Sequence, residues 1–79
     1  MEFYEMAGRI EVQSDVAGKV WKIEAKVGDA LAAEDPVMIL ESMKMEIPVE
    51  TEKAGKLVEI LVAEGDPVGE GQTVAILES

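Results

Sequence analysis

The sequence predicts an all-β domain that folds as a flattened barrel or two-sheet sandwich with a pseudo-two-fold axis. Two observations support this fold class. The apolar residues follow the spacing of strands rather than helices, and Gly, Asp or Pro interrupts them every eight to twelve residues. In addition, residues 10–42 align without a gap on residues 47–79. Of the 33 aligned pairs 13 are identical, so the chain consists of two copies of one unit.

Each copy begins with two strand patterns. In the first copy the strands are expected around residues 10–12 and 20–27. The apolar residues of the second pattern are unevenly spaced, which predicts a β-bulge directly after Val20. The same irregularity recurs at residues 57–62 of the second copy, so we interpret the bulge as part of the fold.

Each copy ends with a turn and a long apolar strand. Glycine at 28 and 65 is followed by aspartate, and glycine adopts positive φ without steric cost, so turns are expected there. Residues 36–41 and 73–78 are apolar on both faces and are expected in the middle of the core. One copy alone has nothing to cover its apolar face, so the two copies are expected to pack against each other.

The composition excludes several functions. The chain has 79 residues and a formal net charge of −10, which argues against binding to nucleic acid or to an anionic membrane surface. It contains no cysteine and no histidine, so a thiolate or imidazole metal site and ordinary hydrolytic or redox catalysis are not expected. No apolar run reaches the ~20 residues of a membrane span. We therefore expect a soluble, cytoplasmic, non-catalytic protein.

The repeat also predicts the domain organisation. Residues 1–9 are expected to form an N-terminal arm, and residues 10–79 a single domain. The two repeats, 10–42 and 47–79, leave only Met43-Lys44-Met45-Glu46 between them. Because equivalent loops of a two-fold repeat lie at opposite ends, both termini are expected at one end and Lys44 at the other.

The joint between the copies is the strongest candidate for a functional site. Strand patterns on both sides require a tight reversal at Met43-Lys44, although such turns favour Asn-Gly or Gly-Gly. Tight turning without glycine implies local strain, and strain often accompanies function. Flexible methionines on both sides of Lys44 suit a surface that several partners grip; the alternative is that Met43 or Met45 fills a gap in the core.

At these residues a family resemblance becomes visible. The run Glu41-Ser42-Met43-Lys44-Met45-Glu46-Ile47-Pro48 resembles the attachment sequence of biotinyl domains, the biotin carboxyl carrier family, in which Met-Lys-Met follows an acidic residue. Ser42 departs from the alanine that is usual there. The duplicated strands and Gly-Asp turns extend the resemblance over residues 10–79. It implies a barrel-sandwich hybrid of eight short strands in two four-stranded sheets, without the inserted thumb of some carriers.

The resemblance also implies a function. Lys44 would receive covalent biotin from a biotin protein ligase, with Met43 and Met45 beside the cofactor. The attached biotin would then carry carboxyl groups from a biotin carboxylase to a carboxyltransferase. Glu41, Ser42 and Glu46 are the candidate residues for ligase recognition, although Glu41 and Glu46 would equally serve as solubilising charges.

Two other functions remain open. A lipoyl carrier domain of a 2-oxo acid dehydrogenase-type complex has a similar duplicated barrel, but its lysine typically lies between aspartate and alanine. An unmodified β interaction module would need no reactive lysine between the copies. Trp21 is replaced by Val58 in the second copy, so we interpret it as partly buried packing rather than as a platform for biotin.

Overall fold

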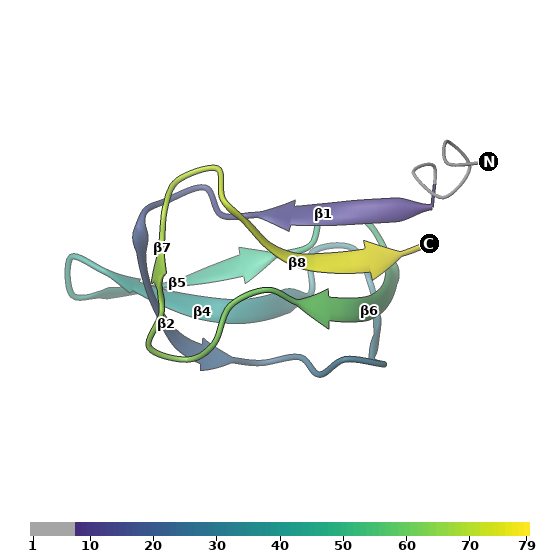
Figure 1. The fold of residues 1–79 in the computed structure, drawn as a ribbon, viewed down its shortest axis with the longest axis horizontal. Coiled ribbons are helices and arrows are strands. Elements are labelled where there is room, and N and C mark those ends of the chain that lie inside the picture. Colours follow the sequence, from purple (N-terminus) through teal and green to yellow (C-terminus); the bar gives the residue numbers. More distant parts are fainter. Residues whose placement is uncertain (1–7) are drawn as a thin grey trace.

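The computed structural model describes residues 8–79 and confirms the predicted all-β class (Figure 1). None of these residues belongs to a helix that is long and apolar enough to cross a membrane. The expected boundary between an arm (1–9) and the domain (10–79) stays a prediction, since residues 1–7 lie outside the described part. The strands are β1 (Arg9–Gln13), β2 (Gly18–Ile23), β3 (Ala30–Leu31), β4 (Pro36–Ser42), β5 (Met45–Glu50), β6 (Gly55–Ile60), β7 (Pro67–Val68) and β8 (Thr73–Glu78).

The strands form two antiparallel four-stranded sheets packed face to face. The sheet with the order β1-β8-β6-β3 contains the first and last strands and is called the terminal sheet below. The other, with the order β5-β4-β2-β7, contains the β4–β5 hairpin and is called the hairpin sheet. The predicted sandwich of two four-stranded sheets is therefore confirmed.

The two sheets are related by a pseudo-two-fold axis. Moving every strand four places along the chain converts the order of one sheet into that of the other. The turns repeat in the same way. The Gly28 N–H donates to the Leu57 carbonyl at 2.7 Å, and 37 residues later the Gly65 N–H donates to the Val20 carbonyl at 2.7 Å. Each copy thus fastens a turn to the other copy.

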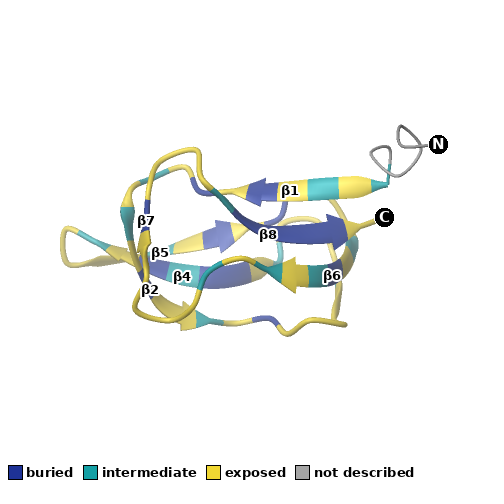
Figure 2. Ribbon diagram, viewed as in Figure 1, coloured by how far each residue is buried: buried dark blue, intermediate teal, exposed yellow. Residues whose placement is uncertain are grey.

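The core lies between the sheets and is built mostly from β4 and β8. Val37, Met38 and Leu40 of β4 and Val74 and Leu77 of β8 have no exposed surface (Figure 2). Both strands are flanked by neighbours on each side within their sheets. This position confirms the prediction that residues 36–41 and 73–78 occupy the middle of the core.

The irregular spacing after Val20 is a bulge, as predicted. The register of β2 on β4 shifts between Val20 and Lys22, and that of β6 on β8 shifts between Leu57 and Glu59. The residue within the β2 bulge is Trp21. Trp21 is 49% exposed, which agrees with its interpretation as partly buried packing. An extra residue at a bulge re-aims a side chain, and here it presents an aromatic ring to solvent.

One side-chain hydrogen bond near a turn is made by a residue that differs between the two copies. Glu64 Oε2 accepts a hydrogen bond from the Ile23 N–H at 3.1 Å and holds the segment before β7 against β2. The equivalent position 37 residues earlier is Val27, which is 60% exposed. We expect Val27→Gln to supply a corresponding acceptor for the Ile60 N–H and to raise the free energy of unfolding by about 0.5 kcal/mol.

Urea unfolding followed by circular dichroism measures this change. The matched control is Val27→Leu, which adds apolar surface but no acceptor and is expected to leave stability unchanged. Equal stabilisation by both variants would show that apolar contact, and not the hydrogen bond, is responsible.

Candidate functional site

The candidate site is the tip of the β4–β5 hairpin. The two strands remain paired up to Ser42 and Met45, so only Met43 and Lys44 form the loop. Both loop residues have positive φ, 53° at Met43 and 66° at Lys44, as in a type I′ turn. A side chain in this left-handed region costs about 1–2 kcal/mol per residue. The strain expected from a tight turn without glycine is therefore present.

The hairpin presents Lys44 to solvent. Lys44 is exposed, and the flanking Met43 and Met45 are 91% and 60% exposed. The alternative that Met43 or Met45 fills a gap in the core is wrong, because both residues are largely exposed. Neither of the two ion pairs found among residues 8–79 includes Lys44.

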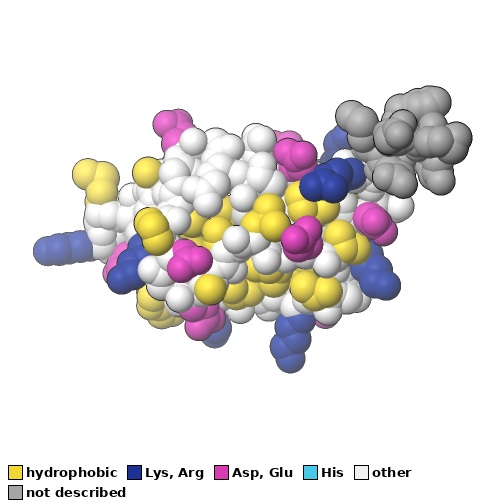
Figure 3. Space-filling view, viewed as in Figure 1, with side chains coloured by type: hydrophobic (Ala, Val, Ile, Leu, Met, Phe, Trp, Pro, Cys, Tyr) yellow, Lys and Arg dark blue, Asp and Glu magenta, His cyan; other side chains and the backbone are white. Residues whose placement is uncertain are grey.

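The hairpin lies at the end of the molecule opposite to the start of β1 and the finish of β8 (Figure 1), as predicted. In Figure 3 a basic side chain projects along the long axis at this end. The tip of the hairpin therefore lies beyond the packed sheets.

The residues that the sequence singled out for recognition lie at the base of the same hairpin. Glu41 and Glu46 are exposed and directly opposite each other on β4 and β5, and Ser42 is half-buried beside them. Like charges in direct cross-strand register destabilise a sheet. Lys19 of β2 lies opposite Glu41 on its other side. The roles of these three residues in recognition stay predictions.

The equivalent positions in the terminal sheet have a different pattern of charge. There Glu78 of β8 lies between Lys56 of β6 and Arg9 of β1, so its charge alternates with that of both neighbours. In the hairpin sheet the position of Arg9 is taken by Glu46. At the base of the hairpin, the hairpin sheet therefore has a pair of like charges, Glu41 and Glu46, where the terminal sheet has alternating charges.

Gly18, which the sequence analysis did not single out, supports the base of the hairpin. A Cβ atom at Gly18 would lie 2.8 Å from the Glu41 carbonyl oxygen and 3.4 Å from the Ser42 Cβ. Only glycine lets β2 approach the base of the hairpin this closely. Gly55 makes the equivalent approach to the Glu78 carbonyl oxygen, also at 2.8 Å. The sequence does contain a sign of this close approach, because Ala-Gly-Lys occurs at the same position in both copies.

The residues present fit a covalently attached cofactor. Amide formation needs an accessible amine, and the hairpin holds the Lys44 amine at its tip with flexible apolar side chains on either side. No group of three or more acidic side chains within residues 8–79 is arranged to hold a metal ion. This arrangement fits a point of covalent attachment.

Comparison with known proteins identifies the family. The model of the family described as "Biotin-requiring enzyme" matches residues 6–77. Because this match spans nearly the whole chain, the chain belongs to that family. The resemblance seen around Met43-Lys44-Met45 is confirmed.

Individual relatives agree with this assignment. A 38-residue segment is 50% identical to the biotin/lipoyl attachment protein of Bacillus subtilis and covers 48% of this chain and 52% of that protein. A segment of the same length is 45% identical to a putative urea carboxylase of Emericella nidulans, covering 48% of this chain and 3% of the carboxylase. The match thus spans about half of the first relative and a small part of the second.

Two solved structures contain the same fold. A part of the Kluyveromyces lactis urea carboxylase superposes with a TM-score of 0.84 and 40% identity, covering 87% of this chain and 6% of that one. A single-chain, multi-domain long-chain acyl-CoA carboxylase gives a TM-score of 0.82 and 28% identity over 90% of this chain and 7% of that one. In both, the corresponding unit is a small part of a much longer polypeptide.

The carboxylate pair at the hairpin base allows a direct test. We expect Glu46→Arg to raise the free energy of unfolding by about 0.5 kcal/mol, because it removes a like-charge pair and restores the alternation found around Glu78. Thermal unfolding at low ionic strength measures the change, and added salt should reduce it. Glu46→Gln, which removes only the repulsion, should give a smaller gain. A loss of stability in Glu46→Arg would contradict this electrostatic explanation.

Proposed function

We propose that this chain is a non-catalytic biotin carrier domain and that Lys44 is its attachment residue. The observation that carries the proposal is the Lys44 amine, exposed between two methionines at the tip of a strained two-residue turn. The family match supports biotin as the cofactor. The structural matches within two carboxylases support a role as a carrier in carboxyl transfer.

The proposed attachment is an acyl transfer. A biotin protein ligase supplies biotinyl-adenylate, the Lys44 Nζ forms an amide with the biotin carboxyl carbon, adenylate leaves and the amine loses a proton. Attached biotin supplies a ureido nitrogen that accepts and releases a carboxyl group. The chain contributes position: the rigid sandwich holds Lys44 outward, and tethering raises the local concentration of the cofactor at partner sites.

The proposed partners are the ligase, a biotin carboxylase and a carboxyltransferase. The net charge of −10 favours basic contact surfaces on all three. Met43 and Met45 would lie next to the attached cofactor and adapt to each partner in turn, because unbranched thioether side chains repack easily.

Lipoate on Lys44 is the second candidate. The name of the Bacillus subtilis relative covers both cofactors, and attachment of lipoate needs the same exposed amine. The methionines on both sides of Lys44 favour biotin. Intact mass after incubation with a biotin ligase or a lipoate ligase distinguishes the two, since each cofactor adds a different mass.

The first test replaces the attachment residue. We expect Lys44→Arg to abolish avidin capture and the mass increase of one biotinyl group, because guanidinium does not form the amide. The free energy of unfolding should change by less than about 0.5 kcal/mol, as for other exposed substitutions. Lys53→Arg is the matched control, an exposed lysine outside the hairpin, and should be labelled like the wild type. Labelling of Lys44→Arg would place the attachment elsewhere.

The second test uses the repeat as an internal control. Gly18→Ala and Gly55→Ala both place a methyl group 2.8 Å from a carbonyl oxygen and should each lower stability by about 1–3 kcal/mol. Only Gly18→Ala should slow biotinylation of Lys44, because Gly18 faces the strand that leads into the hairpin.

Initial rates of labelling are compared at a temperature where circular dichroism shows both variants folded. Equal slowing in both variants would indicate a general effect of stability and would contradict a positioning role for Gly18.

A further inference from the structure

The hairpin tip is too small to be the whole contact with an enzyme that modifies Lys44. Specific protein interfaces involve about 20–30 residues on each side, and even weak ones extend well beyond a single turn. The tip consists of two loop residues and the pair that closes them. A ligase that receives the Lys44 amine must therefore contact a neighbouring surface, and the arrangement of the strands limits which one.

One neighbouring surface is the outer face of the hairpin sheet. Lys22 of β2, Ile39 of β4 and Pro48 of β5 lie side by side in one row across this sheet. Trp21 lies next to the row, in the β2 bulge, with 49% of its surface exposed. Residues 8–79 have five exposed large apolar side chains, and Trp21 is the only aromatic residue among these five. Tryptophan is enriched among the residues that dominate binding energies.

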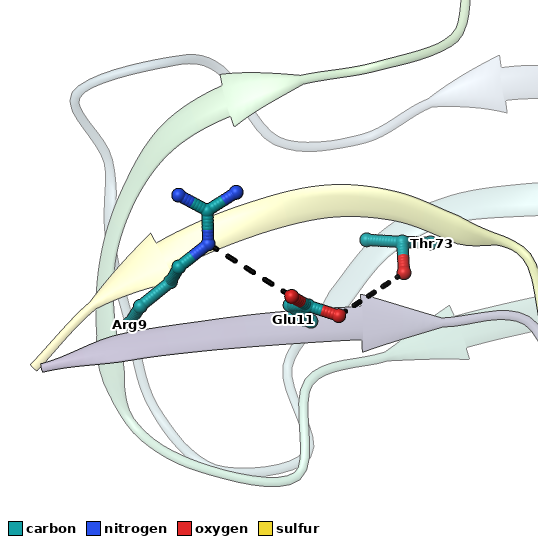
Figure 4. Close-up of polar contacts among 3 residues, drawn as sticks. All are labelled: Arg9, Glu11 and Thr73. Carbon is teal, nitrogen blue, oxygen red and sulfur yellow. Dashed lines mark hydrogen bonds and ion pairs between the residues drawn. The ribbon is translucent and has the colours of Figure 1, made fainter. Parts of the chain in front are cut away.

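The outer face of the terminal sheet has no aromatic residue at the position equivalent to Trp21. The positions of Trp21 and Pro48 are taken there by Val58 and Glu11. Glu11 interacts with Arg9 at 3.9 Å and accepts a hydrogen bond from the Thr73 hydroxyl at 3.4 Å (Figure 4). Both faces belong to the same fold, so packing does not require the aromatic residue. The apolar surface is specific to the sheet that carries Lys44.

A second surface that borders the hairpin sheet is the groove between β1 and β5. Five carboxylates and the basic side chains of Arg9 and Lys53 line it, together with apolar residues that include Pro48. Charged residues are depleted at the centres of protein interfaces, whereas aromatic residues and methionine are enriched. The composition therefore favours the Trp21 face. The carboxylates are those of Glu11, Asp15, Glu34, Glu50 and Glu52.

We propose that Trp21, Ile39 and Pro48 form the docking surface for the ligase that acylates Lys44. Trp21 enters an apolar pocket of that enzyme, while basic groups of the enzyme face the adjacent pair Glu41 and Glu46. The ligase thus contacts the outer face of the hairpin sheet as well as the hairpin. This inference rests on the proposed attachment of biotin to Lys44.

The experiment uses a purified biotin protein ligase with biotin and MgATP. Intact mass first establishes that the wild-type chain gains one biotinyl group on Lys44. The KM and kcat for the chain are then measured for Trp21→Val, which copies the residue of the second repeat and keeps the fold. We expect KM to rise about tenfold with little change in kcat, because docking weakens while the hairpin is unchanged. Trp21→Phe should recover part of the loss.

Two further measurements separate docking from structure. Val58→Ala, at the equivalent position of the terminal sheet, should leave KM unchanged. Lys44→Arg, which cannot be acylated, should inhibit competitively, and adding Trp21→Val should raise its inhibition constant by the same factor as KM.

The outcomes distinguish the two proposals. An unlabelled wild-type chain would overturn the proposed function itself. Normal labelling of the wild type with an unchanged KM in Trp21→Val would overturn only the docking surface. Normal labelling of Trp21→Val together with poor carboxylation by a biotin carboxylase would also overturn the docking surface for the ligase. That result would assign the Trp21 face to the carboxylase. Equal losses in Trp21→Val and Val58→Ala would indicate a structural effect and would also contradict the proposal.

Discussion

The structure depends on the burial of one apolar sheet face against its own copy. Met38 and Leu40 from the hairpin sheet and Leu57 and Leu77 from the terminal sheet are completely buried between the sheets. In a chain of 79 residues this single thin core provides most of the stabilisation, at roughly 25 cal/mol per Å² of apolar surface. Backbone hydrogen bonds between the copies fasten the turns of each to the strands of the other. Neither copy can cover its apolar face without the other.

This packing explains how the hairpin tolerates strain. β4 is paired on both sides, with Lys19 of β2 and Glu46 of β5 both opposite Glu41, and the close approach of Gly18 brings β2 against the base of the turn. The strands therefore hold Met43 and Lys44 in a left-handed conformation that a free peptide would avoid. A rigid support suits the proposed attachment, because it keeps the Lys44 amine in a fixed position outside the packed sheets.

The repeat also separates the requirements of folding from those of function. Positions that agree between the copies, such as Gly28 and Gly65, serve turns and packing that both need. Two of the positions that differ lie in the sheet that carries Lys44: Glu46 occupies the place of Arg9, and Trp21 occupies the place of Val58. The first creates a like-charge pair, and the second leaves an aromatic ring half exposed. Both features support the proposed docking of a partner on this face.

The sequence alone determined the all-β class, the two-fold arrangement, the bulge after Val20 and the position of Lys44 far from the termini. These features follow from apolar spacing and an alignment of the copies, which are local and periodic signals. Only the tertiary structure decided that both methionines point to solvent, that Glu41 and Glu46 face each other, and that Trp21 is half exposed. Such features depend on strand register and on which neighbour covers each side chain. No local pattern in a single sequence encodes those relations.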